Sequence, residues 1–336
     1  MTSKDRKLEV QKDSFKIRNQ KSGNYLLKKT IKKYVMFVLQ AFLLFGLCFL
    51  ILQPIFNKIS VSFMEEQDLY DSTVIVLAKN FTMDNYKLAA RLMNFWKTLG
   101  NTFLISTAVS IVQIISCTLV GYGFARFKFP LKKFWFAMVV LVIIVPPQTI
   151  STSLFLHFRY FDIFGIFEAI TGSSLNLRGS VLPYFMMCLG CMGLKDGLYI
   201  YMIRQFFSSI PQELEEAAYV DGCSTLTTFI KIMLPNAVPI LTSCFLFSFV
   251  WQWTDNFYSR MFLGNTQLLA QSLTSISERL GHYIEFTLGK TGGATPAYTQ
   301  SLISTGLLMS VIPLIILYLF AQRNFIESIS SSGIKM

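Results

Sequence analysis

The side chains that most often carry out chemistry are scarce in this sequence and poorly spaced for it. His157 and His282 are the two histidines among 336 residues, and they lack the spacing of a metal site. Gly289-Lys290-Thr291 resembles the end of a phosphate-binding loop, but Ile284 stands where such a loop needs its first glycine. The sequence therefore predicts no catalytic residue, no metal site and no cofactor-binding site, and hence no enzyme.

The most informative pattern lies in the segment 204–239, which predicts two short helices joined by a bend. Pro211 suits a first helical turn, and three glutamates follow where the positive end of the helix dipole favours them. Residues spaced by three and four then form a face with little side-chain bulk, which suits the close approach of another protein. Gly222 ends this helix because glycine readily adopts a positive φ. Ser224 can cap the second helix, which Leu234-Pro235 should end.

The elements that must position this hairpin follow from the hydrophobic pattern. Hydrophobic residues make up 53% of the chain and charged residues 15%, whereas an average soluble domain has about 25% charged residues. A helix needs roughly 20 apolar residues to cross a membrane, and six stretches meet this length. The sequence therefore predicts an all-α membrane protein with six transmembrane helices. Pro146-Pro147 should kink the third, and Lys195 and Asp196 interrupt the fourth. The predicted spans are about 34–56, 102–124, 134–155, 181–203, 240–262 and 305–322.

Basic residues set the predicted orientation. The tail 1–33 carries 11 Lys and Arg, whereas the segment 57–98 balances five basic residues with five acids. The basic segments therefore face the cytoplasm, and six spans place both termini and 204–239 on that side. The predicted organisation is a basic cytoplasmic tail 1–33 beside anionic lipid headgroups, a six-helix domain 34–323 and a cytoplasmic tail 324–336. Because anionic lipid headgroups can account for the net charge of +11, we expect no nucleic acid as a partner.

The spacing within the hairpin resembles a known motif. Glu216-Ala217-Ala218, three residues, Gly222, nine residues, Ile232, one residue and Leu234-Pro235 match the EAA loop of binding-protein-dependent importer permeases. Chance agreement is on the order of 10⁻⁸ per starting position from average residue usage. Residues 34 to 336 resemble the carbohydrate branch of this family, of the maltose and multiple-sugar type. The further matching segments are 121–127, 146–147, 204–207 and 332–335.

This resemblance implies a permease bundle that works with several partners. They are a second, usually different, permease subunit, a cytoplasmic ATPase dimer that holds ATP and magnesium, an extracellular solute-binding protein and a sugar, in particular an oligosaccharide. The resemblance implies that the EAA loop is the surface that couples the permease to the ATPase. It also implies that the protein lies in the bacterial cell membrane. The residues predicted for this coupling surface are Glu213, Glu216, Ala217, Ala218, Asp221, Gly222, Ile232, Leu234 and Pro235.

Solute contacts are predicted in the fifth span. Trp251, Trp253, Asp255 and Asn256 form a candidate pathway cluster, because sugars stack on aromatic faces and intramembrane polar groups are often functional. An aromatic belt at the outer membrane interface is the other interpretation of this cluster, and it is the one that we favour. Trp253-Thr254-Asp255 departs from the Trp-Asn-Asp or Trp-Asn-Glu of the family, and the segment 264–300 is longer than its usual outer loop.

Two other kinds of transporter remain as alternatives. One is an ABC permease for a polar solute other than a sugar. The other is an ion-coupled secondary transporter, for which Asp196 and Asp255 are the only candidate carboxylates, without an internal repeat. Lys195 and Asp196 are expected to pair with each other or with the partner subunit. A receptor or scaffold is disfavoured because it has no reason to keep the EAA spacing.

Overall fold

The computed structural model describes residues 25–333 except 75–76, 265 and 290–292. Most of the basic tail, Lys290-Thr291 and the end of the 332–335 motif lie outside these residues. The chain divides into two units, Met1–Ser60 and Val61–Met336. Residues 25–60 of helix α2 (Tyr25–Ser62) make up the described part of the first unit. From Ile31 on, the apolar side chains of this long helix are mostly exposed.

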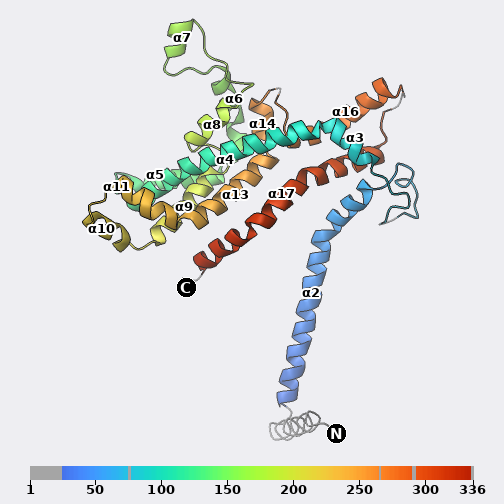
Figure 1. Ribbon diagram of the computed structural model, residues 1–336, viewed down its shortest axis with the longest axis horizontal. Coiled ribbons are helices and arrows are strands. Elements are labelled where there is room, and N and C mark those ends of the chain that lie inside the picture. The colour runs from blue at the N-terminus through green and yellow to red at the C-terminus, as the bar shows by residue number, and fades with distance from the viewer. Residues whose placement is uncertain (1–24, 75–76, 265, 290–292, 334–336) are drawn as a thin grey trace. The chain divides into compact units, whose positions relative to one another are not determined.

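The regular secondary structure of the second unit is helical throughout its described residues, and loops and two isolated β-bridges, Met64 to Phe81 and Phe161 to Leu175, lie between the helices (Figure 1). Two short π-helical segments, Phe229–Met233 and Tyr283–Thr287, and a 3₁₀ segment, Pro147–Ile150, interrupt the α-helices. The α-helices are α3 (Asp84–Met93), α4 (Phe95–Arg126), α5 (Lys132–Ile144), α6 (Ser151–Arg159), α7 (Ile166–Thr171), α8 (Leu182–Leu189), α9 (Asp196–Ser209), α10 (Glu213–Val220), α11 (Thr225–Thr228), α12 (Leu234–Asn236), α13 (Val238–Thr254), α14 (Phe257–Phe262), α15 (Leu269–Thr274), α16 (Ile276–His282) and α17 (Pro296–Gly333).

The predicted all-helical membrane architecture is confirmed, but the described helices do not supply six unbroken spans. Three helices are long and apolar enough to cross a membrane: Ile31–Ser62, Phe95–Arg126 and Pro296–Phe320. Two bent pairs raise the number to five if each is one span. They are Lys132–Ile144 with Pro147–Arg159, bent by 100°, and Thr225–Asn236 with Val238–Thr254, bent by 73°. The predicted kink at Pro146-Pro147 is therefore confirmed as a break between α5 and the following helix.

The predicted fourth span, 181–203, is not one helix. It splits into α8 and α9, and Cys191 and Lys195 between them have positive φ. The Asp196 carboxylate accepts a hydrogen bond from the Gly193 N–H at 2.5 Å, so it holds the turn that precedes α9. The sequence signal that weakened this span, a polar pair in an apolar run, marks the point where the helix breaks.

Helix α4 is the centre of the second unit and packs against α9 and α13. A glycine permits helices α9 and α5 to approach each other closely. A Cβ atom at Gly197 would lie 2.8 Å from the carbonyl oxygen of Val139, and backbone cannot move aside as a flexible side chain can. Residues at such contacts must be small for the helices to meet.

We expect Gly197→Ala to destabilise the protein by about 1–3 kcal/mol, the usual cost of overpacking. Thermal unfolding of the detergent-purified protein measures this effect. Gly100→Ala in α4 is the matched control, because a Cβ atom there meets nothing within 4 Å and alanine favours the helix. Equal melting temperatures for the two variants would contradict the close contact between α5 and α9.

Candidate functional site

The hairpin of α10 and α11 has the local geometry that its sequence predicts. Gly222 has a φ of +81°, and its N–H donates to the Tyr219 carbonyl at 3.0 Å while the Cys223 N–H donates to the Ala218 carbonyl at 2.9 Å. These bonds close the end of α10 around a left-handed residue. The Ser224 hydroxyl then accepts the Thr227 N–H at 3.3 Å. The predicted end of the first helix and the cap of the second are both confirmed.

The predicted end of the second helix at Leu234-Pro235 is wrong. The chain continues from α11 through the π-helical segment into α12, and it bends only at Ala237, before α13. The Leu234 N–H bonds to the Phe229 carbonyl, five residues back. This wider turn places Pro235 among the first residues of α12, where its missing N–H costs nothing.

The predicted coupling residues do not all share one exposed face. Glu213, Glu216, Ala217, Asp221 and Gly222 are exposed. Ala218 is only 3% exposed and faces the protein, so small size at this position serves packing inside the hairpin. The two remaining apolar positions, Ile232 and Leu234, are half-buried, and Pro235 is exposed. The exposed face also carries apolar side chains that the prediction did not include: Leu214, Tyr219, Val220, Leu226 and Ile230.

A buried ion pair that the sequence did not reveal joins the hairpin to α4. Arg126 Nε lies 2.9 Å from Glu215 Oε2, and the two side chains are 7% and 8% exposed. The Tyr122 hydroxyl donates to Glu215 Oε1 at 2.9 Å, and Arg126 Nη2 donates to the Ile210 carbonyl at 2.8 Å. Charged groups are almost never fully buried unless they are paired, so this contact fixes α10 on the end of α4. We call Tyr122, Arg126 and Glu215 the hairpin anchor.

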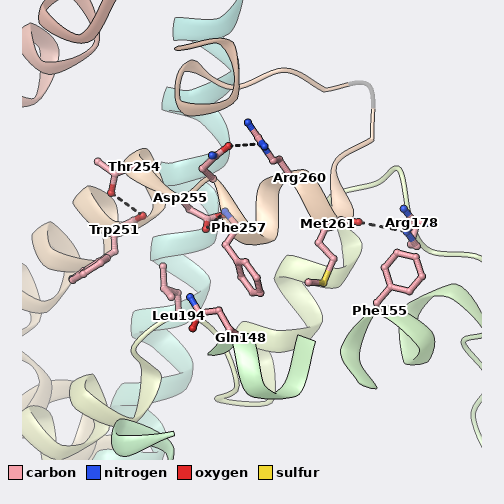
Figure 2. A pocket seen from close by; sticks show the side chains of 11 residues that line it. Gln148, Phe155, Arg178, Leu194, Trp251, Thr254, Asp255, Phe257, Arg260 and Met261 are labelled. Atoms are coloured by element: carbon pink, nitrogen blue, oxygen red, sulfur yellow. Dashed lines mark hydrogen bonds between the residues drawn. The ribbon is translucent and has the colours of Figure 1, made fainter. Parts of the chain in front are cut away.

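A cavity of about 700 Å³ lies at the end of α13 opposite to the hairpin (Figure 2). Three helix interruptions meet there: the 3₁₀ segment after Pro146, the break between α8 and α9, and the break between α13 and α14. Irregular backbone at membrane depth is tolerated where it lines a cavity or is buried in protein. The lining residues are Gln148, Phe155, Arg178, Leu194, Trp251, Thr254, Asp255, Asn256, Phe257, Arg260 and Met261.

The structure divides the predicted pathway cluster. Trp251, Asp255 and Asn256 line the cavity. Trp253 does not line it: its Nε1 donates to the Ser310 carbonyl of α17 at 3.1 Å, and its ring packs against Phe249. The two tryptophans are two residues apart and so point to different sides of the helix.

The Asp255 carboxylate shapes the cavity. It accepts the Tyr184 hydroxyl at 2.6 Å and the backbone N–H groups of Phe257, Tyr258 and Ser259 at 2.9 to 3.2 Å. A carboxylate that caps N–H groups in this way starts a new helix, so the predicted fifth span 240–262 divides into α13 and α14. The cavity residues that the sequence did not single out include Arg178 and Arg260, which lie outside α13 in segments with no motif.

Lys195 and Asp196 do not pair with each other. Asp196 is fully buried and accepts a hydrogen bond from the Gln113 side-chain amide of α4. Ser248 of α13 donates to Gln113 Oε1 at 2.5 Å, so one polar network ties α4, α9 and α13 together. The Lys195 Nζ atom instead lies 4.9 Å from the centroid of the Trp251 ring.

Comparisons with known proteins all match this chain to membrane subunits of transport systems. Residues 117–331 match the family described as binding-protein-dependent transport system inner membrane component. A probable ABC transporter permease protein of Pyrococcus horikoshii is 31% identical over 169 residues, which cover 50% of this chain and 55% of that protein. The arabinooligosaccharides transport system permease protein AraQ of Halalkalibacterium halodurans is 23% identical, with 86% of this chain and 93% of AraQ covered.

A solved structure shares the fold. It is a chain of a bacterial ABC transporter involved in the import of the acidic polysaccharide alginate. The TM-score is 0.66 at 19% sequence identity, over 88% of this chain and 98% of that chain.

Proposed function

Because the chain belongs to the family of binding-protein-dependent transport system inner membrane components, we propose that it is a transmembrane permease subunit of a bacterial ABC importer for a sugar. The names of its relatives, AraQ among them, support a carbohydrate. ATP and magnesium are bound by a separate ATPase, so this chain is not itself an enzyme. A second permease subunit, a cytoplasmic ATPase dimer and an extracellular binding protein complete the assembly in the cell membrane, with both termini in the cytoplasm.

The connection of the hairpin to α4 and α13 is the main support for a mechanism in which the ATPase moves the permease helices. The exposed hairpin is fixed to α4 by the buried hairpin anchor and is continuous with α13 through α12. The cavity lies at the other end of α13, about 25 Å away for 17 residues at 1.5 Å each. A displacement of the hairpin by the ATPase would therefore move α4 and α13 together and change the walls of the cavity. Such rigid-body motion is how alternating access is achieved around a central site.

The proposal predicts that transport depends on ATP and not on an ion gradient. We expect vesicles that contain this chain, its partner permease and the ATPase to take up solute when ATP and the loaded binding protein are present. Uptake should stop when the ATPase is omitted, and it should survive an uncoupler. Uptake that an uncoupler abolishes while ATP is present would instead support the ion-coupled alternative.

A further inference from the structure

The cavity at the end of α13 carries more positive charge than its own carboxylate can balance. Arg178, Asp255 and Arg260 are the charged residues that line it. The Asp255 carboxylate is buried and occupied by three backbone N–H groups and the Tyr184 hydroxyl. The carboxylate therefore caps the N–H groups at the start of α14, and it forms no ion pair with either arginine.

Neutral groups hold both arginines in place. Arg178 Nε donates to the Met261 carbonyl at 3.4 Å, and its guanidinium carbon lies 4.1 Å from the centroid of the Phe155 ring. Arg260 Nε donates to Asn256 Oδ1 at 3.0 Å (Figure 2), and its Nη2 donates to the Thr274 hydroxyl. Within the described part of the chain neither guanidinium is within 4 Å of a carboxylate.

These contacts leave most of the charged hydrogen-bonding capacity unused. A guanidinium has five N–H donors, and the hydrogen bonds above use one from Arg178 and two from Arg260. Lys195 adds a third positive charge beside the cavity, over the ring of the lining residue Trp251. Two cations thus line the cavity and a third lies beside it, whereas its one carboxylate is already occupied.

We propose that this cavity binds an anionic group of the solute, a carboxylate or a phosphate, through Arg178 and Arg260. This inference rests on the proposed function, since it names the class of sugar carried: an acidic or phosphorylated saccharide. Planar guanidinium groups match both oxyanions in geometry and charge. The volume of about 700 Å³ lies within the range of about 300–1,000 Å³ that small-molecule sites occupy. Phe155, Trp251 and Phe257 add aromatic side chains to the lining of the cavity.

The charge of the cavity can be tested without knowledge of the solute. Thr254 is exposed and lines the cavity, so Thr254→Cys in the assembled complex places a thiol there. The rates at which this thiol reacts with an anionic methanethiosulfonate (sulfonatoethyl) and with a cationic one (trimethylammonioethyl) are compared. Each rate is divided by the rate of the same reagent with free mercaptoethanol, and the complex with Thr254 retained gives the background labelling. We expect Arg178→Gln with Arg260→Gln to lower the anionic-to-cationic rate ratio about tenfold, because a charged cleft concentrates counter-ions. Arg159→Gln is the matched control, since Arg159 is exposed but does not line the cavity.

Protection by small molecules identifies the anion. We expect digalacturonate to slow the labelling if the group is a carboxylate, and galactose 1-phosphate to slow it if the group is a phosphate, in both cases only while the arginines are present. Equal protection by the neutral dimethyl ester of digalacturonate, or an unchanged rate ratio in the double variant, would overturn the proposal. Protection by the binding protein alone would overturn it too and make this face a docking surface. The importer assignment would survive each of these results, because ATP-driven uptake tests it separately.

Discussion

Replacement of Ala217 by arginine or of Gly222 by proline should reduce ATP-driven solute uptake by about tenfold or more, while the chain still inserts into the membrane. Ala217 is exposed on α10, where an arginine side chain would hold the ATPase away from the helix. A loss of only about 1.4 kcal/mol in docking is a tenfold loss in affinity. Gly222 has a φ of +81°, whereas proline fixes φ near about −65°, so the bend between α10 and α11 cannot form.

Uptake into vesicles and co-purification of the ATPase measure this effect, with membrane insertion checked by the amount of chain in the membrane fraction. Ala217→Ser is the matched control because it keeps the side chain small, and it should transport at close to the normal rate. Gly222→Ala should be intermediate, since a Cβ atom there meets nothing within 4 Å but left-handed backbone costs alanine about 1–2 kcal/mol. Normal uptake in both Ala217→Arg and Gly222→Pro would show that the hairpin does not couple the ATPase to transport.

The second large effect is expected at the hairpin anchor. Glu215→Ala leaves the Arg126 guanidinium buried without its carboxylate, and removal of one partner of a buried ion pair costs about 3–5 kcal/mol. We expect α10 to detach from α4, so that ATP hydrolysis continues while uptake falls severalfold or more. The ratio of solute taken up to ATP hydrolysed, measured in reconstituted vesicles, reports this uncoupling.

A double-mutant cycle separates the ion pair from general damage to the fold. Arg126→Met combined with Glu215→Leu removes both charges. The double variant should be less harmful than Arg126→Met alone or Glu215→Leu alone, because no unpaired charge stays buried. Tyr122→Phe should have a smaller effect, since it removes one hydrogen bond of the anchor. Additive losses in the double variant would mean that the two side chains do not act on each other.

The sequence predicted the features of this fold that depend on neighbouring residues. The bend at Gly222, the cap at Ser224 and the break at Pro146-Pro147 all follow from the backbone preferences of single residues. Spacing alone also located the hairpin, because the EAA pattern is local. The end of the second helix was misplaced at Leu234-Pro235, since a π-helical segment changes the register in which a proline is tolerated.

Features that depend on distant residues could not be predicted in this way. Glu215 and Arg126 are far apart in the chain, and nothing in the type of either residue says that it is buried. The helix breaks at Asp196 and Asp255 have a common cause, a carboxylate that bonds backbone N–H groups inside an apolar run. The sequence showed the carboxylates, but their partners became visible only in the fold. Arg178 and Arg260 were missed for the same reason, since the cavity gathers them from separate segments.

The side of the membrane that the hairpin faces tests whether an ATPase docks there. Val220 is 88% exposed at the tip of the hairpin, so Val220→Cys, in a chain with Cys223→Ser, can be labelled with a membrane-impermeant maleimide. We predict labelling in inverted vesicles but not in intact cells, and protection when the ATPase is bound. Labelling of Val220→Cys from outside intact cells, or equal labelling with and without the ATPase, would show that the hairpin is not the docking surface of the ATPase.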